Sequence, residues 1–148
     1  GWLARFMQKV PVFPIPGSGR FLRQPLFAGD FCDVIASAIK KEMTGAYNIT
    51  GQERIDYIDL IRAVKKATGA KAHIQTIPYG LFWTLLKANA MFDRDPAFTV
   101  GQLKALVTPD VFEVIDWPTI FGVRATPLQE ALNKTFRDPV YSHITLDF

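Results

Sequence analysis

Few side chains in this sequence could carry out chemistry, and their spacing does not assemble a catalytic or metal centre. Cys32, His73 and His143 show none of the clustered spacing of a zinc or iron site. Cys32 lies among apolar residues of an expected helix, which predicts a thiol in or near the core and not a nucleophile. Ser18 stands in Pro-Gly-Ser-Gly-Arg, which lacks the strand-to-helix transition of a nucleophile elbow and indicates a flexible turn. We therefore predict no catalytic residue and no metal ligand in this chain.

A dinucleotide cofactor also finds no recognisable site in the sequence. Pyrophosphate binding in an α/β fold uses a glycine-rich turn such as G-x-G-x-x-G between a strand and a helix N-terminus. Glycines occur together at 17–19, but the sequence contains no such motif. By itself the chain is expected to bind neither NAD nor NADP.

Length and composition favour one domain that also buries apolar surface against a partner. The 148 residues are 49% hydrophobic and 13% aromatic, which fits such a domain. The net charge of +3 comes from dispersed Lys and Arg, so no nucleic-acid partner is expected. A single cysteine fits a reducing compartment, and we expect a cytoplasmic protein. The longest apolar run, 79–92, is interrupted by Lys87 and is shorter than the ~20 residues of a membrane-spanning helix.

Hydrophobic periodicity and turn residues predict a mixed α and β lobe in which short strands alternate with helices. The expected helices cover 2–9, 30–41, 56–68, 79–92, 100–107 and 126–136, and the expected strands or extended segments cover 10–16, 21–27, 46–50 and 72–77. Asp30 and Asp56 are the expected N-caps of the second and third helices, and Gly69 is the expected end of the third. In 126–129, Thr is the expected cap of the last helix, Pro takes its first position and Gln completes a capping box. We interpret 1–148 as a single domain.

Three sequence blocks resemble a known family when they are taken in order. The blocks are GSGRFLRQPLFAGD at 17–30, GAYNITG at 45–51 with the helix that follows, and FGVRATPLQEAL at 121–132. Together they are similar to the C-terminal, substrate-binding part of the extended and atypical short-chain dehydrogenases, the NAD-dependent epimerase/dehydratase family. Phe27 stands where many sugar-nucleotide epimerases have His, and the likeness to those enzymes fades after Phe92. These departures favour the atypical branch, which includes relatives resembling the 39 kDa accessory subunit of respiratory complex I.

The resemblance implies a protein of two parts. An N-terminal Rossmann half, expected to lie outside this chain, would bind NAD or NADP and carry the Tyr-x-x-x-Lys pair, which none of the four tyrosines here forms. The lobe at 1–148 would close over a nucleotide sugar or a similar polar substrate. In such a lobe Val12 and Phe13 would meet the nucleotide base, Arg23 would bind the diphosphate and Arg94 would be a second diphosphate ligand. The alternatives are a core or interface position for Phe13 and surface positions for Arg23 and Arg94.

Three functions remain open on the sequence alone. The first is the substrate-binding part of an epimerase, dehydratase or reductase, hence of an isomerase or oxidoreductase, inactive as an isolated fragment. The second is a non-catalytic accessory or assembly subunit, and the third is a free-standing binding or membrane-surface module that uses the helix at 79–92. We also expect the isolated lobe to self-associate through an exposed apolar patch that involves Trp2, Phe6, Phe82 and Trp83.

Overall fold

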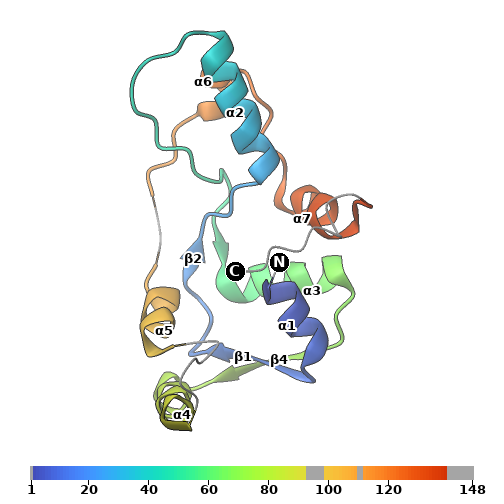
Figure 1. Ribbon diagram of the computed structural model, residues 1–148, viewed down its shortest axis with the longest axis vertical. Helices are drawn as coiled ribbons and strands as arrows, with labels where there is room; N and C mark the ends of the chain where they lie inside the picture. The colour runs from blue at the N-terminus through green and yellow to red at the C-terminus, as the bar shows by residue number, and fades with distance from the viewer. Residues whose placement is uncertain (1, 93–98, 110–111, 140–148) are drawn as a thin grey trace.

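The chain folds into a mixed α/β structure, shown in Figure 1 as a computed structural model that describes residues 2–92, 99–109 and 112–139. In this part of the chain there are seven helices and four short strands. The helices are α1 (Trp2–Lys9), α2 (Ala28–Lys40), α3 (Tyr57–Thr68), α4 (Tyr79–Phe92), α5 (Val100–Val107), α6 (Trp117–Phe121) and α7 (Leu128–Arg137). The strands are β1 (Val12–Pro16), β2 (Leu22–Arg23), β3 (Ile55–Asp56) and β4 (His73–Ile77). The expected mixture of helices and short strands is confirmed at this level.

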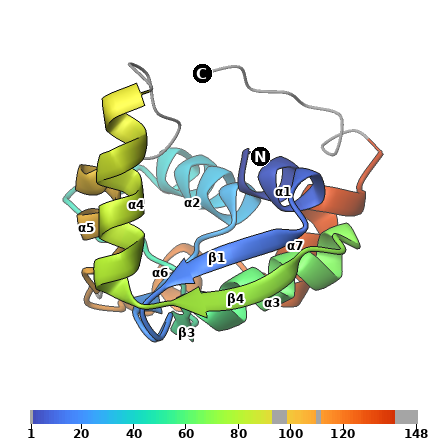
Figure 2. The same ribbon diagram turned by 90° about the horizontal axis from the view of Figure 1, so that it is seen from below.

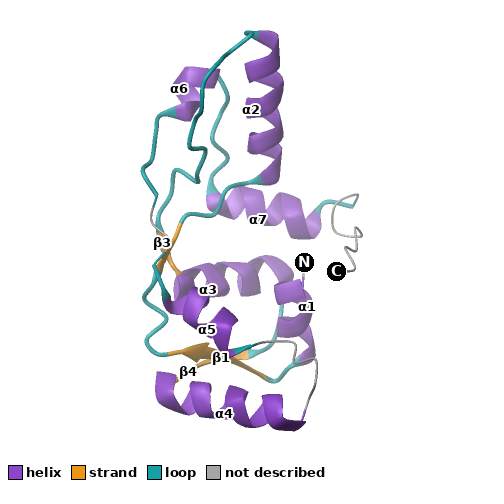
Figure 3. Cartoon of the chain, turned by 60° about the vertical axis from the view of Figure 1, so that its left-hand side comes forward, coloured by secondary structure: helices purple, strands orange, loops and turns teal. Residues whose placement is uncertain are grey.

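The larger core is built on a parallel pair of strands, β1 and β4, which lie side by side in Figure 2. Their register runs from Val12 opposite His73 to Pro16 opposite Ile77. α1 and α3 cover one side of this pair, and α4 lies on the other side (Figures 1 and 3). Phe13 of β1 is buried there together with side chains of β1, α1 and α3, namely Ile15, Ala4, Met7, Ile61 and Val64. Parallel strands need a long crossover connection, and α2 and α3 lie within it.

A second core lies at the other end of the molecule, where α2 and α6 pack together (Figure 3). Val34 of α2 meets Trp117 and Phe121 of α6, and all three side chains are buried. α6 was not predicted, because its five residues are too few to show a hydrophobic period. The residues that define α6 are the caps at its two ends. The Asp116 carboxylate accepts a hydrogen bond from a backbone N–H of the first turn, and Gly122 ends the helix at a φ of 67°.

The strand predicted over 46–50 is wrong, because this segment adopts no regular structure. Its backbone is held by a side chain and not by a neighbouring strand: the indole Nε1 of Trp117 donates to the Thr50 carbonyl at 2.7 Å. The Tyr47 ring also packs edge-on against Phe121, with ring centroids 5.2 Å apart. The alternation of apolar residues that suggests a strand therefore reflects packing against α6.

The strand predicted over 21–27 is much shorter in the structure. Only Leu22–Arg23 pairs, antiparallel, with Ile55–Asp56. Pro25 has no N–H to donate, which prevents the ladder from continuing in regular form. The expectation that Pro25 occupies a terminal or edge position of this strand is therefore wrong, because the strand ends at Arg23 and Pro25 lies outside it.

The predicted helix caps are partly wrong. Asp30 lies inside the first turn of α2 and bonds to another segment. Asp56 occupies the N-cap position of α3, but within the described residues its side chain makes no capping bond. The capping box at 126–129 does not form, because α7 begins after Pro127 and Thr126 bonds elsewhere. Gly69 ends α3 at a φ of 68°, as predicted.

Two helices leave apolar side chains in solvent. α4 exposes Leu81, Leu85 and Met91, and one face of α2 exposes Phe31, Ile35 and Ile39.

Cys32 lies on α2 and is exposed, so the prediction of a core thiol is wrong. The reason is that α2 packs only its Val34 side against α6. Four aromatic residues were expected in a patch for self-association. Phe82 and Trp83 are half-buried, and Phe6 packs edge-on against Phe13 in the larger core. The side chain of the fourth, Trp2, is not among those that the structure describes. No helix within residues 2–92, 99–109 and 112–139 has the length and apolar character needed to cross a membrane.

Candidate functional site

A pocket of about 330 Å³ lies where four segments distant in sequence meet. Its walls come from the chain before and at the start of α2, from residues 51–53, from Trp117 of α6, and from residues 125–135 before and within α7. Apolar walls are provided by Phe27, Trp117 and Leu132, and polar groups by Asp30, Glu53 and Thr126. Its volume falls at the lower end of the range of small-molecule sites, about 300 to 1,000 Å³, and its mixed lining is of the same kind.

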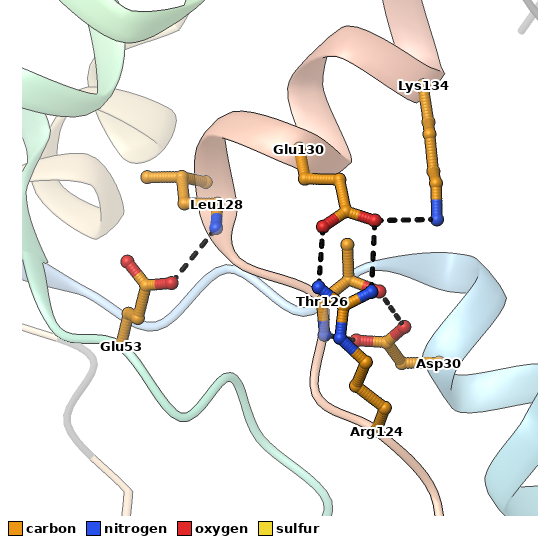
Figure 4. A network of polar contacts seen from close by, with 7 residues as sticks. All are labelled: Asp30, Glu53, Arg124, Thr126, Leu128, Glu130 and Lys134. Atoms are coloured by element: carbon orange, nitrogen blue, oxygen red, sulfur yellow. Dashed lines mark hydrogen bonds and ion pairs between the residues drawn. The ribbon is translucent and has the colours of Figure 1, made fainter.

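Asp30 and Thr126, which both line this pocket, are directly linked (Figure 4). The Asp30 carboxylate is 5% exposed and accepts two hydrogen bonds, from the Thr126 backbone N–H at 2.7 Å and from its hydroxyl at 2.6 Å. A buried carboxylate needs such donors to compensate for its lost hydration. Asp30 therefore joins the start of α2 to the chain that enters α7.

Glu53 makes the second link. Its carboxylate accepts a hydrogen bond from the Leu128 backbone N–H at 2.9 Å. This N–H belongs to the first turn of α7 and has no partner within the helix, so Glu53 acts as an N-terminal cap supplied from another segment. Figure 4 shows Glu53 reaching α7 from the side opposite to Asp30.

On the outer surface of α7, Glu130 pairs with two cations. Its carboxylate lies 2.8 Å from an Arg124 guanidinium nitrogen and 3.0 Å from the Lys134 ammonium (Figure 4). Hydrogen bonds from Arg124, and then from Lys134, hold the pKa of the Glu130 carboxyl below its ordinary value. All three side chains are solvent-accessible, so the cluster orients the start of α7 without adding much stability.

Gly51 brings two walls of the pocket into backbone contact. It is buried, and a Cβ atom there would overlap the carbonyl of Pro25. Only glycine permits this approach, because the obstacle is backbone and cannot rotate away. The first and second sequence blocks are therefore packed main chain to main chain.

The chemistry of this pocket suits binding better than catalysis. Both oxygens of Asp30 are engaged by Thr126, and Glu53 is engaged by α7, so neither carboxylate is presented as a free acid or base. Within the described residues, no group of three or more His, Cys, Asp and Glu side chains could hold a metal ion, and His143 lies outside them.

Gly17 and Gly19 lie in the turn between β1 and β2 and not at a helix N-terminus, where a pyrophosphate would need them.

The residues predicted to bind substrate do not line this pocket. Val12 is exposed on β1, whereas the neighbouring Phe13 is buried in the larger core, as one alternative for it proposed. Arg94 lies outside the described residues. Arg23 lies on β2, half-buried, at a separate place in the fold.

Arg23 holds the C-terminal end of α5. Its guanidinium donates to the carbonyl of Thr108 at 3.0 Å, to that of Leu106, and at 3.5 Å to that of Ala105. It also stacks over the Phe21 ring at 5.6 Å. The last carbonyls of a helix have no intrahelical partner and favour a cation, so Arg23 is a long-range cap of α5.

Tyr57, at the start of α3, shares this environment. Its ring stacks on Phe21 with centroids 5.3 Å apart. Burial raises the pKa of the Tyr57 phenol above its ordinary value, and the nearby Arg23 charge partly opposes this rise.

Gln24, the residue after Arg23, makes a second contact with a distant segment. Its side-chain carbonyl accepts a hydrogen bond from the Phe112 backbone N–H at 2.6 Å. Arg23 and Gln24 thus anchor the chain on both sides of residues 110–111.

Two long-range contacts were not predicted: the link from Asp30 to Thr126 and the Arg23 cap at the C-terminal end of α5. Asp30 and Thr126 both lie inside the resembling blocks, but the sequence favoured local capping for each of them. Comparison with known proteins adds no relative, because neither a protein-family model nor a curated protein matches this chain.

Proposed function

We propose that this chain is the substrate-binding lobe of a short-chain-dehydrogenase-like protein that works with an NAD- or NADP-binding Rossmann domain. The observation that carries this proposal is the convergence of the three resembling blocks on one pocket. Asp30 of the first block bonds to Thr126 of the third, and Gly51 of the second packs on Pro25 of the first. Each block alone resembles the family only in part, and their packing into one unit supports the resemblance of the whole chain.

In this proposal the lobe binds a nucleotide sugar or a similar polar substrate and the partner domain supplies the reaction. The cofactor and the Tyr and Lys of an epimerase, dehydratase or reductase would belong to the Rossmann domain, since the lobe has no pyrophosphate turn in its described part. The apolar faces of α2 and α4 offer surface that such a domain could cover. The single cysteine fits the cytoplasm as the compartment.

A second function is favoured by one specific observation. The Arg23 guanidinium is committed to the end of α5, so a diphosphate would have to displace those carbonyls to be bound by it. In this lobe the Arg that was expected to bind a diphosphate instead holds a helix. That role suits a non-catalytic accessory or assembly subunit, in which the fold provides surfaces for other proteins.

The test is a titration of the ¹⁵N-labelled chain with UDP-glucose and, separately, with NADH, followed by amide chemical shifts. The enzyme proposal expects UDP-glucose to shift amides of β1, β2 or the pocket, and expects no stoichiometric binding of NADH. Absence of shifts with a panel of nucleotide sugars would favour the accessory subunit. Tight NADH binding by this chain would contradict both.

A further inference from the structure

A basic depression of about 480 Å³ lies at the end of α3 and the start of β4, formed by residues that do not line the pocket at α7. Four nitrogen-bearing side chains surround it: Arg62, Lys65, Lys66 and His73. Small and apolar residues complete its lining, among them Ala70 and Ile74. Among the described residues that line it there is no Asp or Glu. The depression therefore has the lining of a site for an anion.

The two lysines are not needed to complete α3. The end of this helix is already capped by Arg137 of α7, whose guanidinium donates to the carbonyls of Ala67 at 3.0 Å and Lys66 at 3.2 Å. Thr68 adds a hydroxyl bond to the Val64 carbonyl at 2.9 Å. A cation in the last turn ordinarily complements the helix dipole, but here Arg137 fills that role by direct contact.

The positive charges at this depression are only partly compensated. Arg62 pairs with Asp59 at 2.8 Å, but both side chains are more than half exposed, so water weakens the pair. For Lys65 and Lys66 the described part of the chain provides no ion-pair partner. The depression thus keeps at least two charges available to a ligand.

We propose that this depression binds a small ligand that carries two or more phosphate groups. Residues three and four apart on a helix have Cβ atoms about 5 to 6 Å apart, so Arg62, Lys65 and Lys66 form one cluster of donors. A guanidinium and ammonium groups are the side chains that bind phosphates best. His73, the first residue of β4, adds a further nitrogen-bearing side chain to the lining. A single phosphate would engage part of this set, whereas a polyphosphate spans it.

The experiment is calorimetric titration of the full chain with inorganic tripolyphosphate at low ionic strength, with sulfate at matched ionic strength as the control anion. Lys65→Gln with Lys66→Gln should weaken binding at least tenfold. Lys40→Gln with Lys104→Gln is the matched control, because these lysines also lie in last turns of helices and the net charge changes equally. It should change binding less than twofold. Circular dichroism establishes that both variants fold.

Amide shifts place the site and separate this proposal from the proposed function. Tripolyphosphate should shift the amides of Ala70, His73 and Ile74, whereas substrate binding concerns β1, β2 and the pocket at α7. A second measurement is cosedimentation with vesicles that contain phosphatidylinositol bisphosphate. If the chain cosediments with them and the Lys65→Gln, Lys66→Gln variant does not, the phosphates belong to a lipid headgroup. Binding of tripolyphosphate without cosedimentation assigns them to a free ligand. Equal losses in the two double variants, or no preference for tripolyphosphate over sulfate, would overturn the proposal.

Discussion

Removing the Asp30 carboxylate should destabilise the fold strongly, because this side chain joins the two cores. Asp30→Ala deletes two hydrogen bonds to a charged acceptor and leaves the Thr126 N–H and hydroxyl without their partner. A bond to a charged group contributes about 1.5 to 3 kcal/mol, so the loss of both bonds should cost about 3 to 6 kcal/mol. Urea unfolding followed by Trp fluorescence measures this directly.

Two conservative variants separate the charge from the geometry. In Asp30→Asn the side-chain oxygen can still accept from the Thr126 N–H, and the amide can donate to the hydroxyl oxygen, so we expect a smaller loss of about 1 to 2 kcal/mol. Thr126→Val keeps the shape but removes one donor. Because the residues contact each other, the double variant should cost less than the sum of the single variants.

Two results would refute this reasoning. If Asp30→Ala costs less than about 1 kcal/mol, the two bonds do not hold the start of α7 to α2. If the costs of Asp30→Asn and Thr126→Val are additive, the residues do not interact in solution. Glu53→Gln is a useful control, because its single bond to Leu128 lies in solvent and should contribute less.

Arg23→Ala should destabilise the chain by about 2 kcal/mol, measured by urea unfolding, and should increase hydrogen exchange in α5. Arg23→Lys should recover part of this stability. Because the folded pKa of Tyr57 lies above its unfolded value, its contribution to stability is present below about pH 10 and is lost as pH rises through the folded pKa. Tyr57→Phe should therefore flatten the alkaline fall in stability seen by urea unfolding. Ile39 is 74% exposed, so if the apolar face of α2 drives self-association, Ile39→Glu should shift light scattering toward monomer and leave the unfolding midpoint unchanged.

The sequence predicted those parts of the fold whose signals are local. α3 follows a periodic run of apolar residues and α4 a continuous apolar run. Gly69 ends α3 because it adopts the left-handed conformation that glycine tolerates. The N-terminal cap of α5 is local too, although it was not predicted: Thr99 and Gln102 form a capping box there. The strand expected over 46–50 was wrong because its environment is decided by Trp117, far along the chain.

The candidate site shows why residue type alone does not determine a role. Arg23 was singled out as a diphosphate ligand because a planar guanidinium presents several donors in a fixed geometry. Those same donors suit the carbonyls at the end of a helix, and α5 supplies them from a part of the chain whose position no local pattern predicts. Asp30 illustrates the same principle, since an Asp near a helix start can cap that helix or reach across to Thr126. Because the donors of Arg23 can bind α5 or a diphosphate but not both, a lobe that uses Arg23 for substrate must release the end of α5.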